Sequence, residues 1–457
     1  MALRALRVCA VVVLVLASFG AGAAVAAGPV TDTGFSPDDN AAFLIEIPAD
    51  WNGTLVLYSH GYVAPGSENP ARDAGDPVTH DFLLAQKYAL AGSAYASTGW
   101  AVKDALHDQI ALLDYFSTKY GTDGKLKRTI AWGHSLGGMI TAGLVQRHPE
   151  RFAGALPMCG VLAGGVGVWN SVLDGEFVFK TLLAPDQPLD LVKIGNPRAN
   201  VALAQQILQA AQASPQGRAR LALVAAVGDV PGWFDPATPE PAANDFDVRE
   251  QNQFLWDQNP DFVFSFALRA ELEARAGGNP SWNTGVDYAR LLERSVDRDE
   301  VRALYRTAGL DLEQDLATLE AAPRIAANPA AVDYLTDNIV FNGDLGDVPV
   351  LTMHTKGDGL VVNQDEQAYA SIVEDRALLR QVFVDRAGHC AFTPAETVAA
   401  FNALVRRIDT GEWSGVNPAR LNAAAAALKP LNVAFSGPSF IPFRPTVFLR
   451  PFSIDED

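Results

Sequence analysis

Short apolar runs alternate with helical patterns in the first third of the chain and again near its end. The runs that fit buried strands lie at residues 54–59, 88–95, 128–132, 154–162, 348–354 and 380–385. An amphipathic helical pattern covers residues 101–120, and another helix-like stretch covers residues 139–148. This alternation predicts an α/β fold, in which a mostly parallel sheet is covered by helices on both faces.

The alternation stops between residues 163 and 346. Segments rich in alanine, leucine and arginine there predict helices at residues 199–227, 262–276 and 286–308. Asn328 and Pro329 fit the cap and first turn of one more helix. We therefore expect an α/β core at 28–162 and 347–457, interrupted by a largely helical insertion at 163–346. The tail at 431–452, rich in proline and phenylalanine, is expected to pack in an extended form against the sheet or the insertion.

A serine flanked by glycines joins one predicted strand to the helix that follows it. The segment Gly133-His-Ser-Leu-Gly137 lies between the apolar run at 128–132 and the helical stretch at 139–148. A tight turn from strand to helix needs small residues two positions away on each side, because larger side chains would clash where the backbone doubles back. This context predicts that Ser135 is an exposed nucleophile.

A partner acid and base follow later in the chain. Asp358 lies in a glycine-flanked loop after the strand at 348–354, and His389 follows the strand at 380–385. Of the seven histidines, only His389 follows that acid. A histidine can take the proton of the serine, and a carboxylate can hold the imidazole in the required tautomer. Asp365, at a predicted helix start, and Asp385, four residues before His389, are the alternative acids.

With G-x-S-x-G on this turn and the order serine, acid, histidine, the chain resembles the α/β-hydrolase superfamily. The resemblance implies an oxyanion hole made by the backbone N–H groups of Leu136 and Tyr62, with Gly61 as the alternative to Tyr62. His60-Gly-Tyr62 directly follows the strand at 54–59, where this fold places its oxyanion loop. The same resemblance implies that the insertion at 163–346 is a cap or lid.

The resemblance implies a serine hydrolase that cleaves carboxylic esters through an acyl-enzyme intermediate and needs no metal or cofactor. The substrate is expected to be a small-molecule or polymeric ester. A serine peptidase, aminopeptidase-like, on the same fold is the alternative, and a non-catalytic binding protein is a third reading that the triad order disfavours. A serine at the elbow excludes dehalogenase and epoxide hydrolase chemistry, which needs an acid there.

The first 27 residues have the pattern of a secretory signal peptide. Arg4 and Arg7 precede the apolar stretch at 8–16, and small residues follow at 24–27. The apolar stretch is short for a permanent membrane anchor, which is the alternative reading. We therefore expect a secreted protein.

Export would leave two cysteines, Cys159 and Cys390, of which the second directly follows His389. An oxidising compartment favours a disulfide between them, although two buried thiols fit the sequence as well. The tannase and feruloyl-esterase group also has a cysteine after its histidine, bridged to one immediately before its serine. This chain has His134 at that position, which argues against placing it in that group.

The charge of the chain excludes some classes of binding partner, and its aromatic residues indicate where a substrate could bind. The formal net charge of −18 speaks against nucleic acid and against an anionic membrane surface, and we expect no stable membrane insertion. No spaced metal-ligand motif is apparent, and the oligomeric state is left open. Aromatic residues gather in the insertion, where Trp256 and Phe264 are candidates to line a substrate pocket. The alternative is that they form the core of a helical subdomain.

Overall fold

The computed structural model describes residues 28–36, 38–435 and 437–453. The predicted signal peptide at 1–27 lies outside the described residues. A single mixed sheet runs in the order β1-β2-β4-β3-β5-β6-β7-β8-β9. Its strands are β1 Val30–Phe35, β2 Ala42–Ile47, β3 Thr54–Ser59, β4 Ala89–Ser93, β5 Arg128–His134, β6 Gly154–Met158, β7 Val350–Gly357, β8 Leu379–Ala387 and β9 Phe440–Ile441.

Strands from β4 across to β8 pair in parallel, and antiparallel strands close both edges of the sheet. The mostly parallel sheet confirms the predicted fold class. Because successive side chains of a strand point to opposite faces, Leu55 and Leu57 join one apolar core, and Val56 and Tyr58 join the other. This is why the inner strands consist of apolar residues without alternation.

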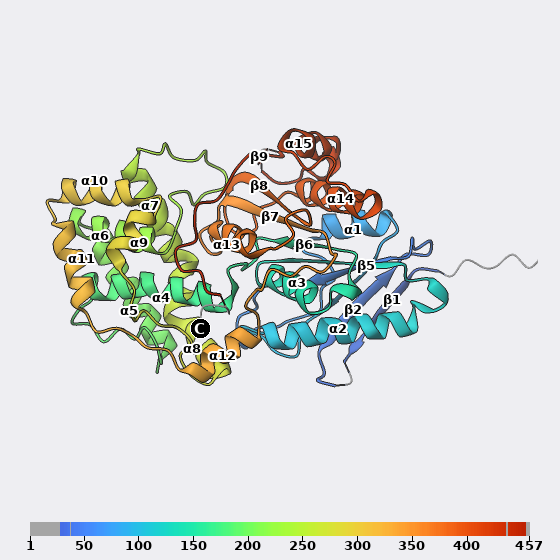
Figure 1. The fold of residues 1–457 in the computed structure, drawn as a ribbon, viewed down its shortest axis with the longest axis horizontal. Coiled ribbons are helices and arrows are strands. Elements are labelled where there is room, and N and C mark those ends of the chain that lie inside the picture. The colour runs from blue at the N-terminus through green and yellow to red at the C-terminus, as the bar shows by residue number, and fades with distance from the viewer. Residues whose placement is uncertain (1–27, 37, 436, 454–457) are drawn as a thin grey trace, which may run out of the picture.

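Helices cover both faces of the sheet, as Figure 1 shows. The core that contains Leu55 is completed by residues of α2, α3 and α13, and the core that contains Val56 is completed by residues of α1, α14 and α15. These helices are α1 Pro77–Ala85, α2 Val102–Lys119, α3 Leu136–Arg147, α13 Gln364–Ile372, α14 Pro394–Thr410 and α15 Pro418–Ala427.

Between β6 and β7 the chain forms a helical insertion, which lies to one side of the sheet (Figure 1). A separate apolar core, built almost wholly from residues of this insertion, holds its helices together. The helices are α4 Gly164–Leu183, α5 Pro197–Gln212, α6 Pro215–Val227, α7 Phe246–Trp256, α8 Arg269–Ala276, α9 Tyr288–Arg294, α10 Arg298–Ala308, α11 Leu312–Ala321 and α12 Pro329–Asp337.

Two of the helices expected in the insertion are each divided in two. The segment at 199–227 forms α5 and α6, since Ser214 leaves the helical conformation and caps α6 by accepting from the N–H of Gly217 at 3.0 Å. The segment at 286–308 forms α9 and α10, because Ser295 adopts an extended backbone. The predicted cap at Asn328 is present and accepts from the N–H of Ala330 at 3.0 Å.

The tail joins the sheet to the insertion. After β9 pairs with β8, the chain continues without regular structure, and an ion pair links Arg450 to Asp174 of α4. Arg450 also donates to the carbonyl of Trp282 at 3.1 Å. The tail therefore packs in an extended form, as expected, and it contacts both the sheet and the insertion. None of the helices among the described residues is long and apolar enough to cross a membrane.

Candidate active site

Ser135 lies at the turn between β5 and α3 with φ 59° and ψ −126°, a backbone conformation that is costly for a residue with a side chain. The flanking glycines make the turn possible. A Cβ at Gly133 would lie 2.3 Å from the carbonyl oxygen of Gly137, and one at Gly137 would lie 2.0 Å from that of Ser59. The spacing read from the sequence is therefore a steric requirement of the turn.

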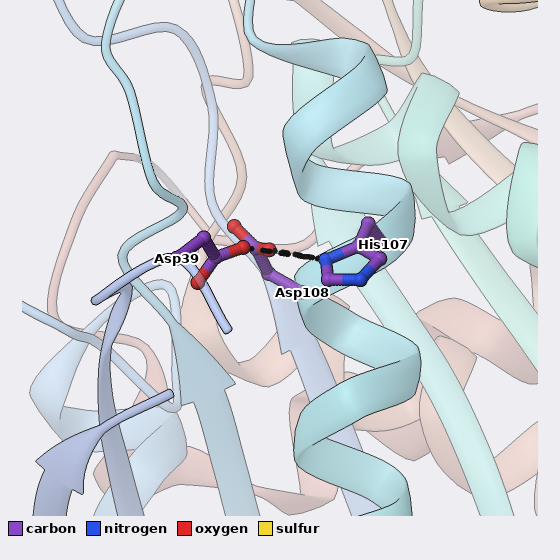
Figure 2. A group of neighbouring side chains, drawn as sticks. All are labelled: Asp39, His107 and Asp108. Carbon is purple, nitrogen blue, oxygen red and sulfur yellow. Dashed lines mark hydrogen bonds and ion pairs between the residues drawn. The ribbon is translucent and has the colours of Figure 1, made fainter. Parts of the chain in front are cut away.

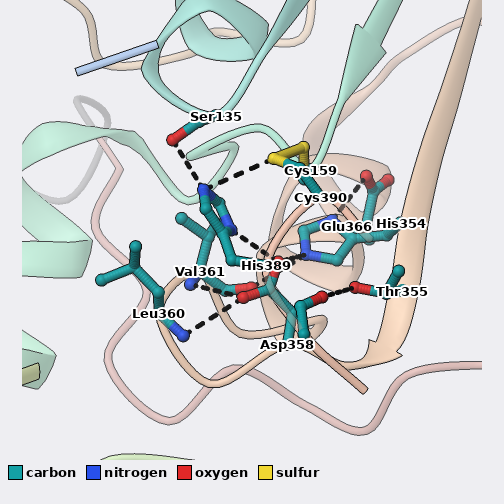
Figure 3. The surroundings of a disulfide bond; sticks show 11 residues. Ser135, Cys159, His354, Thr355, Asp358, Leu360, Val361, Glu366, His389 and Cys390 are labelled. Carbon is teal, nitrogen blue, oxygen red and sulfur yellow. Dashed lines mark hydrogen bonds and ion pairs between the residues drawn. A yellow bond between two sulfur atoms is a disulfide. The ribbon is translucent and has the colours of Figure 1, made fainter. Parts of the chain in front are cut away.

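Ser135, His389 and Asp358 form a continuous hydrogen-bonded chain, shown in Figure 3. Oγ of Ser135 lies 2.8 Å from Nε2 of His389, and Nδ1 of His389 lies 2.8 Å from Oδ2 of Asp358. Ser135 follows β5, Asp358 follows β7 and His389 follows β8. In the sheet, β7 and β8 are neighbours, and β6 lies between β5 and β7. This geometry suits proton transfer from the serine to the imidazole.

Asp358 is fully buried and held in place from several sides. Its Oδ1 accepts from the N–H groups of Leu360 and Val361, both at 3.1 Å. Burial alone would raise the pKa of this carboxyl, but the attraction of His389 and the hydrogen bonds from His354 and His389 outweigh it, so the pKa is lowered. The group is therefore an anion that can orient His389.

The two alternative acids do not contact His389. Asp365 accepts from the N–H of Ala163 at 2.9 Å, which ties α13 to the start of the insertion. Asp385 is half-exposed, with its carboxylate 3.9 Å from Nζ of Lys356. Both act in the packing of the chain around the site.

The loop that carries His389 is fixed at both ends. The hydroxyl of Thr355 donates to the carbonyl of Gly388 at 2.7 Å, and a disulfide joins Cys390 to Cys159 at the end of β6. Beneath the loop, Arg386 and Glu396 form a buried ion pair at 2.8 Å. Glu396 also completes a capping box with Thr393 at the start of α14. The signal for this box in the sequence is Thr393-Pro-Ala-Glu396.

The candidate oxyanion donors lie beside Ser135. A Cβ at Gly61 would lie 3.2 Å from Cβ of Ser135, so the loop after β3 passes close to the serine. Nδ1 of His60 lies 2.7 Å from the carbonyl of Gly61, and the ring of His60 stacks on that of Tyr95 at 4.0 Å. Leu136 begins α3, where the first N–H groups have no acceptor within the helix. The backbone at Gly61 and the first residue of α3 therefore both lie beside Ser135, on the two segments from which oxyanion donors are expected.

A largely apolar pocket lies over Ser135, between the sheet and the insertion. Its lining includes Tyr62 and Leu136 from the core and Trp169 and Phe264 from the insertion. The rings of Tyr62 and Phe264 meet at 5.0 Å. The pocket thus has the character expected of a site for a small acyl or aryl group.

Trp256 does not line this pocket, in contrast to the expectation from the sequence. Its ring is buried against Gly359 and Phe234, and its indole N–H donates to the carbonyl of Trp233 at 2.9 Å. Trp256 is therefore part of an apolar cluster, whereas Phe264 lines the cavity over Ser135. The sequence could not separate them because both lie in the same aromatic segment.

Two other groups of acids and histidines meet in the fold, away from the pocket. Figure 2 shows Asp39, His107 and Asp108, where Nδ1 of His107 lies 3.0 Å from Asp108 and 3.3 Å from Asp39. Burial and the hydrogen bond with Asp39 raise the pKa of Asp108 to about 7, and that hydrogen bond lowers the pKa of Asp39 to about 2. The hydrogen bond with Asp108 and the charges of both carboxyls raise the pKa of His107, which faces the two acids. The second group is Glu46, Asp73 and His80.

Parts of the chain are similar to a known protein family and to solved structures. The prolyl oligopeptidase family model matches residues 89–164, which include Ser135. Among solved structures, feruloyl esterase B from Aspergillus oryzae is 14% identical with a TM-score of 0.38, and 84% of this chain and 80% of that chain are covered. Another esterase from Aspergillus oryzae is 12% identical with a TM-score of 0.41 at the same coverage.

A relative of higher identity spans nearly the whole chain. The o-phthalyl amidase of Xanthobacter agilis is 31% identical over 424 residues, which are 85% of this chain and 90% of that protein. The chain therefore belongs to the o-phthalyl amidase family of serine hydrolases, within the α/β-hydrolase superfamily.

Proposed function

We propose that this protein hydrolyses carboxylic amides, and esters of the same acids, through an acyl-enzyme on Ser135. The observation that carries the proposal is the chain of two 2.8 Å hydrogen bonds from Ser135 through His389 to the buried Asp358. The apolar pocket over Ser135 adds a place for the acyl group. Among the described residues that line the pocket, no other hydroxyl has a histidine in hydrogen-bond contact.

The proposed reaction has two halves. Oγ of Ser135 attacks the carbonyl carbon, and its proton passes to Nε2 of His389, while the oxyanion accepts hydrogen bonds from the N–H groups of Tyr62 and Leu136. His389 then gives the proton to the leaving amine or alcohol, which leaves the acyl group on Ser135. Water, deprotonated by His389, hydrolyses that ester. Asp358 stabilises the imidazolium in both halves.

Amides are placed first because the relative that matches almost the whole chain is an amidase. Carboxylic ester hydrolysis, which the sequence led us to expect, uses the same acyl-enzyme and a better leaving group. A peptidase remains the alternative among the amide hydrolases. Whether the protein is chiefly an amidase or an esterase therefore depends on the relative rates at which it cleaves amide and ester bonds at this one site.

A matched pair of substrates distinguishes these activities. The 4-nitroanilide and the 4-nitrophenyl ester of one acid, benzoic acid, share an acyl-enzyme and differ only in the leaving group. We expect turnover of both, and its loss in Ser135→Ala. Hydrolysis of the ester without detectable hydrolysis of the anilide, by an enzyme that is active on other esters, would show an esterase instead. Hydrolysis of both by Ser135→Ala at the unmodified rate would refute the proposal.

We also propose that the protein is exported through its N-terminal segment. The pattern of residues 1–27 supports this, and so does the disulfide, a bond typical of oxidising compartments. N-terminal sequencing of the protein released by its natural host should give a start near residue 28. A start at Met1, with the protein inside the cell, would contradict export.

A further inference from the structure

The pocket over Ser135 is apolar on most of its surface but contains four carboxyl side chains. They belong to Glu176 of α4, to Asp257 and Asp261 in the segment after α7, and to Asp365 of α13. No lysine or arginine is among the described residues that line it. The polar character of this pocket is therefore acidic.

Two of the four carboxyls have partners within the protein. Asp365 accepts the N–H of Ala163 at 2.9 Å. The carboxylate of Glu176 lies 3.2 Å from Nη2 of Arg269, whose side chain is fully buried. The contact of Asp365 joins α13 to the start of the insertion, and Arg269 compensates the charge of Glu176 within the insertion, although neither carboxylate oxygen of Glu176 has a hydrogen-bond partner among the described residues.

Asp257 and Asp261 differ from both, because neither forms an ion pair with a basic side chain among the described residues. Oδ2 of Asp257 and both carboxylate oxygens of Asp261 are buried and have no hydrogen-bond partner among the described residues. Asp257 is only 3% exposed. Buried polar atoms in native proteins are nearly always paired, since leaving one unpaired costs about 1–3 kcal/mol. Two such groups four residues apart, in the pocket that holds the nucleophile, indicate that a ligand pairs with them.

The acidic surroundings of these two carboxyls bear on the charge of that ligand. Burial raises the pKa of both carboxyls well above the usual range, and repulsion by neighbouring acids raises it further: Glu250 acts on Asp257, and Asp257 and Asp358 act on Asp261. A cation between the two carboxyls would reverse this effect by stabilising their ionised form. A carboxylate ligand would instead meet acidic groups with no basic side chain beside them.

We propose that Asp257 and Asp261 form a subsite for a protonated amino group of the substrate. The inference rests on the proposed function, because it assumes that the pocket over Ser135 receives the scissile compound. An ammonium group offers three N–H donors to the two carboxylates, and its hydrocarbon part can pack on Phe264 and Tyr62. The substrate class is thus an amide or ester of small size that carries an aromatic or aliphatic body and an amino group.

Binding to the Ser135→Ala protein tests the subsite without any turnover. Calorimetry would compare phenethylamine, 3-phenylpropionate and the neutral 3-phenylpropan-1-ol at pH 7. We expect phenethylamine to bind tightest and to release protons as the carboxyls ionise, which appears as a dependence of the measured heat on the buffer. Asp257→Asn and Asp261→Asn should each weaken amine binding by roughly 10- to 100-fold, the range for a hydrogen bond to a charged group.

Asp299→Asn is the matched control, since Asp299 is an exposed acid of the insertion, and it should leave amine binding unchanged. Melting curves of each variant verify that it folds; should one aspartate variant not fold, the other and the comparison of the three ligands decide. Equal affinity for the amine and the alcohol, tighter binding of the carboxylate, or undiminished amine binding in both folded variants would overturn the subsite. Labelling of Ser135 by a fluorophosphonate in the wild-type protein is independent of the subsite: if it occurs while amine binding fails, only the subsite is wrong, and if it fails, the proposed function is wrong.

Discussion

Nε2 of His354 lies 3.5 Å from Oδ2 of Asp358, the same oxygen that accepts from His389. That nitrogen also lies 2.8 Å from the carbonyl of Val361, and Nδ1 lies 3.3 Å from Oε1 of Glu366. Both ring nitrogens therefore face acceptors, which favours the doubly protonated imidazolium. Burial lowers the pKa of His354, but the hydrogen bonds and charges of Asp358 and Glu366 outweigh it and raise the pKa to about 10.

The first prediction is that His354→Gln loses a contribution to stability that depends on pH. The folded pKa of about 10 exceeds the usual 6.5, so the folded state binds more protons between these values. The stabilisation is complete below pH 6.5 and disappears as the pH rises through about 10. Urea unfolding of both proteins at pH 6, 8 and 10.5 measures this. A difference in the free energy of unfolding that stays constant over this range would mean that His354 acts through packing alone.

The second prediction concerns the disulfide that precedes α14. Cys159 and Cys390 are 231 residues apart, and Sγ of Cys390 lies 3.4 Å from Nε2 of His389. Reduction should therefore lower the free energy of unfolding by about 2–4 kcal/mol and reduce kcat, because the loop of His389 is released. The double variant Cys159→Ser, Cys390→Ser should behave like the reduced protein. Two thiols that react with an alkylating agent in the unfolded, unreduced protein would show that the bond is absent.

The third prediction concerns the turn at the nucleophile. Gly137→Ala would place a Cβ against the carbonyl of Ser59, so the turn must shift and displace Ser135. A displacement of about 1 Å can lower kcat/KM roughly 100-fold. Gly195→Ala is the control, because no atom lies within 4 Å of the added Cβ. Equal kcat/KM in the two variants would mean that the elbow tolerates the extra methyl group.

The fourth prediction separates pocket from core in the aromatic segment. Phe264→Ala should redistribute kcat/KM among acyl groups of different size by roughly 10- to 200-fold, because its ring lines the pocket. Trp256→Ala should instead lower the free energy of unfolding by about 3–5 kcal/mol. Kinetics on a size series of acyl substrates, together with urea unfolding, measure both. A uniform loss of activity in Phe264→Ala would place this residue in the core as well.

The fold class and the candidate residues Ser135, Asp358 and His389 could be predicted because their signals are local. Each residue lies within two positions of the end of an apolar strand, and parallel strands bring their ends to one edge of the sheet. The edge strands β1 and β2 were missed, since their half-exposed side chains give only a weak apolar pattern. The breaks at Ser214 and Ser295 were missed because the helical composition continues across them.

Other features of the site depend on contacts that no local pattern contains. His354 precedes the acid and looks like one more residue of a buried strand, yet the fold sets it beside Asp358. Asp257 and Asp261 lie in an aromatic segment that carries no signal of their burial, and the fold places both in the lining of the pocket over Ser135. The sequence therefore indicates the candidate nucleophile and its candidate partners, but it does not reveal the chemistry of the pocket.

The most direct test of the acyl-enzyme mechanism is to map the residue that a fluorophosphonate modifies in the folded protein. We predict one adduct, on the peptide that contains Ser135, with loss of hydrolysis in proportion to labelling. Ser135→Ala should not be labelled, and its kcat should fall by about 10⁴-fold or more. His389→Ala should react far more slowly, and the double variant should be no worse than either single one. An adduct on another residue, or Ser135→Ala with the kcat of the unmodified protein, would contradict the mechanism.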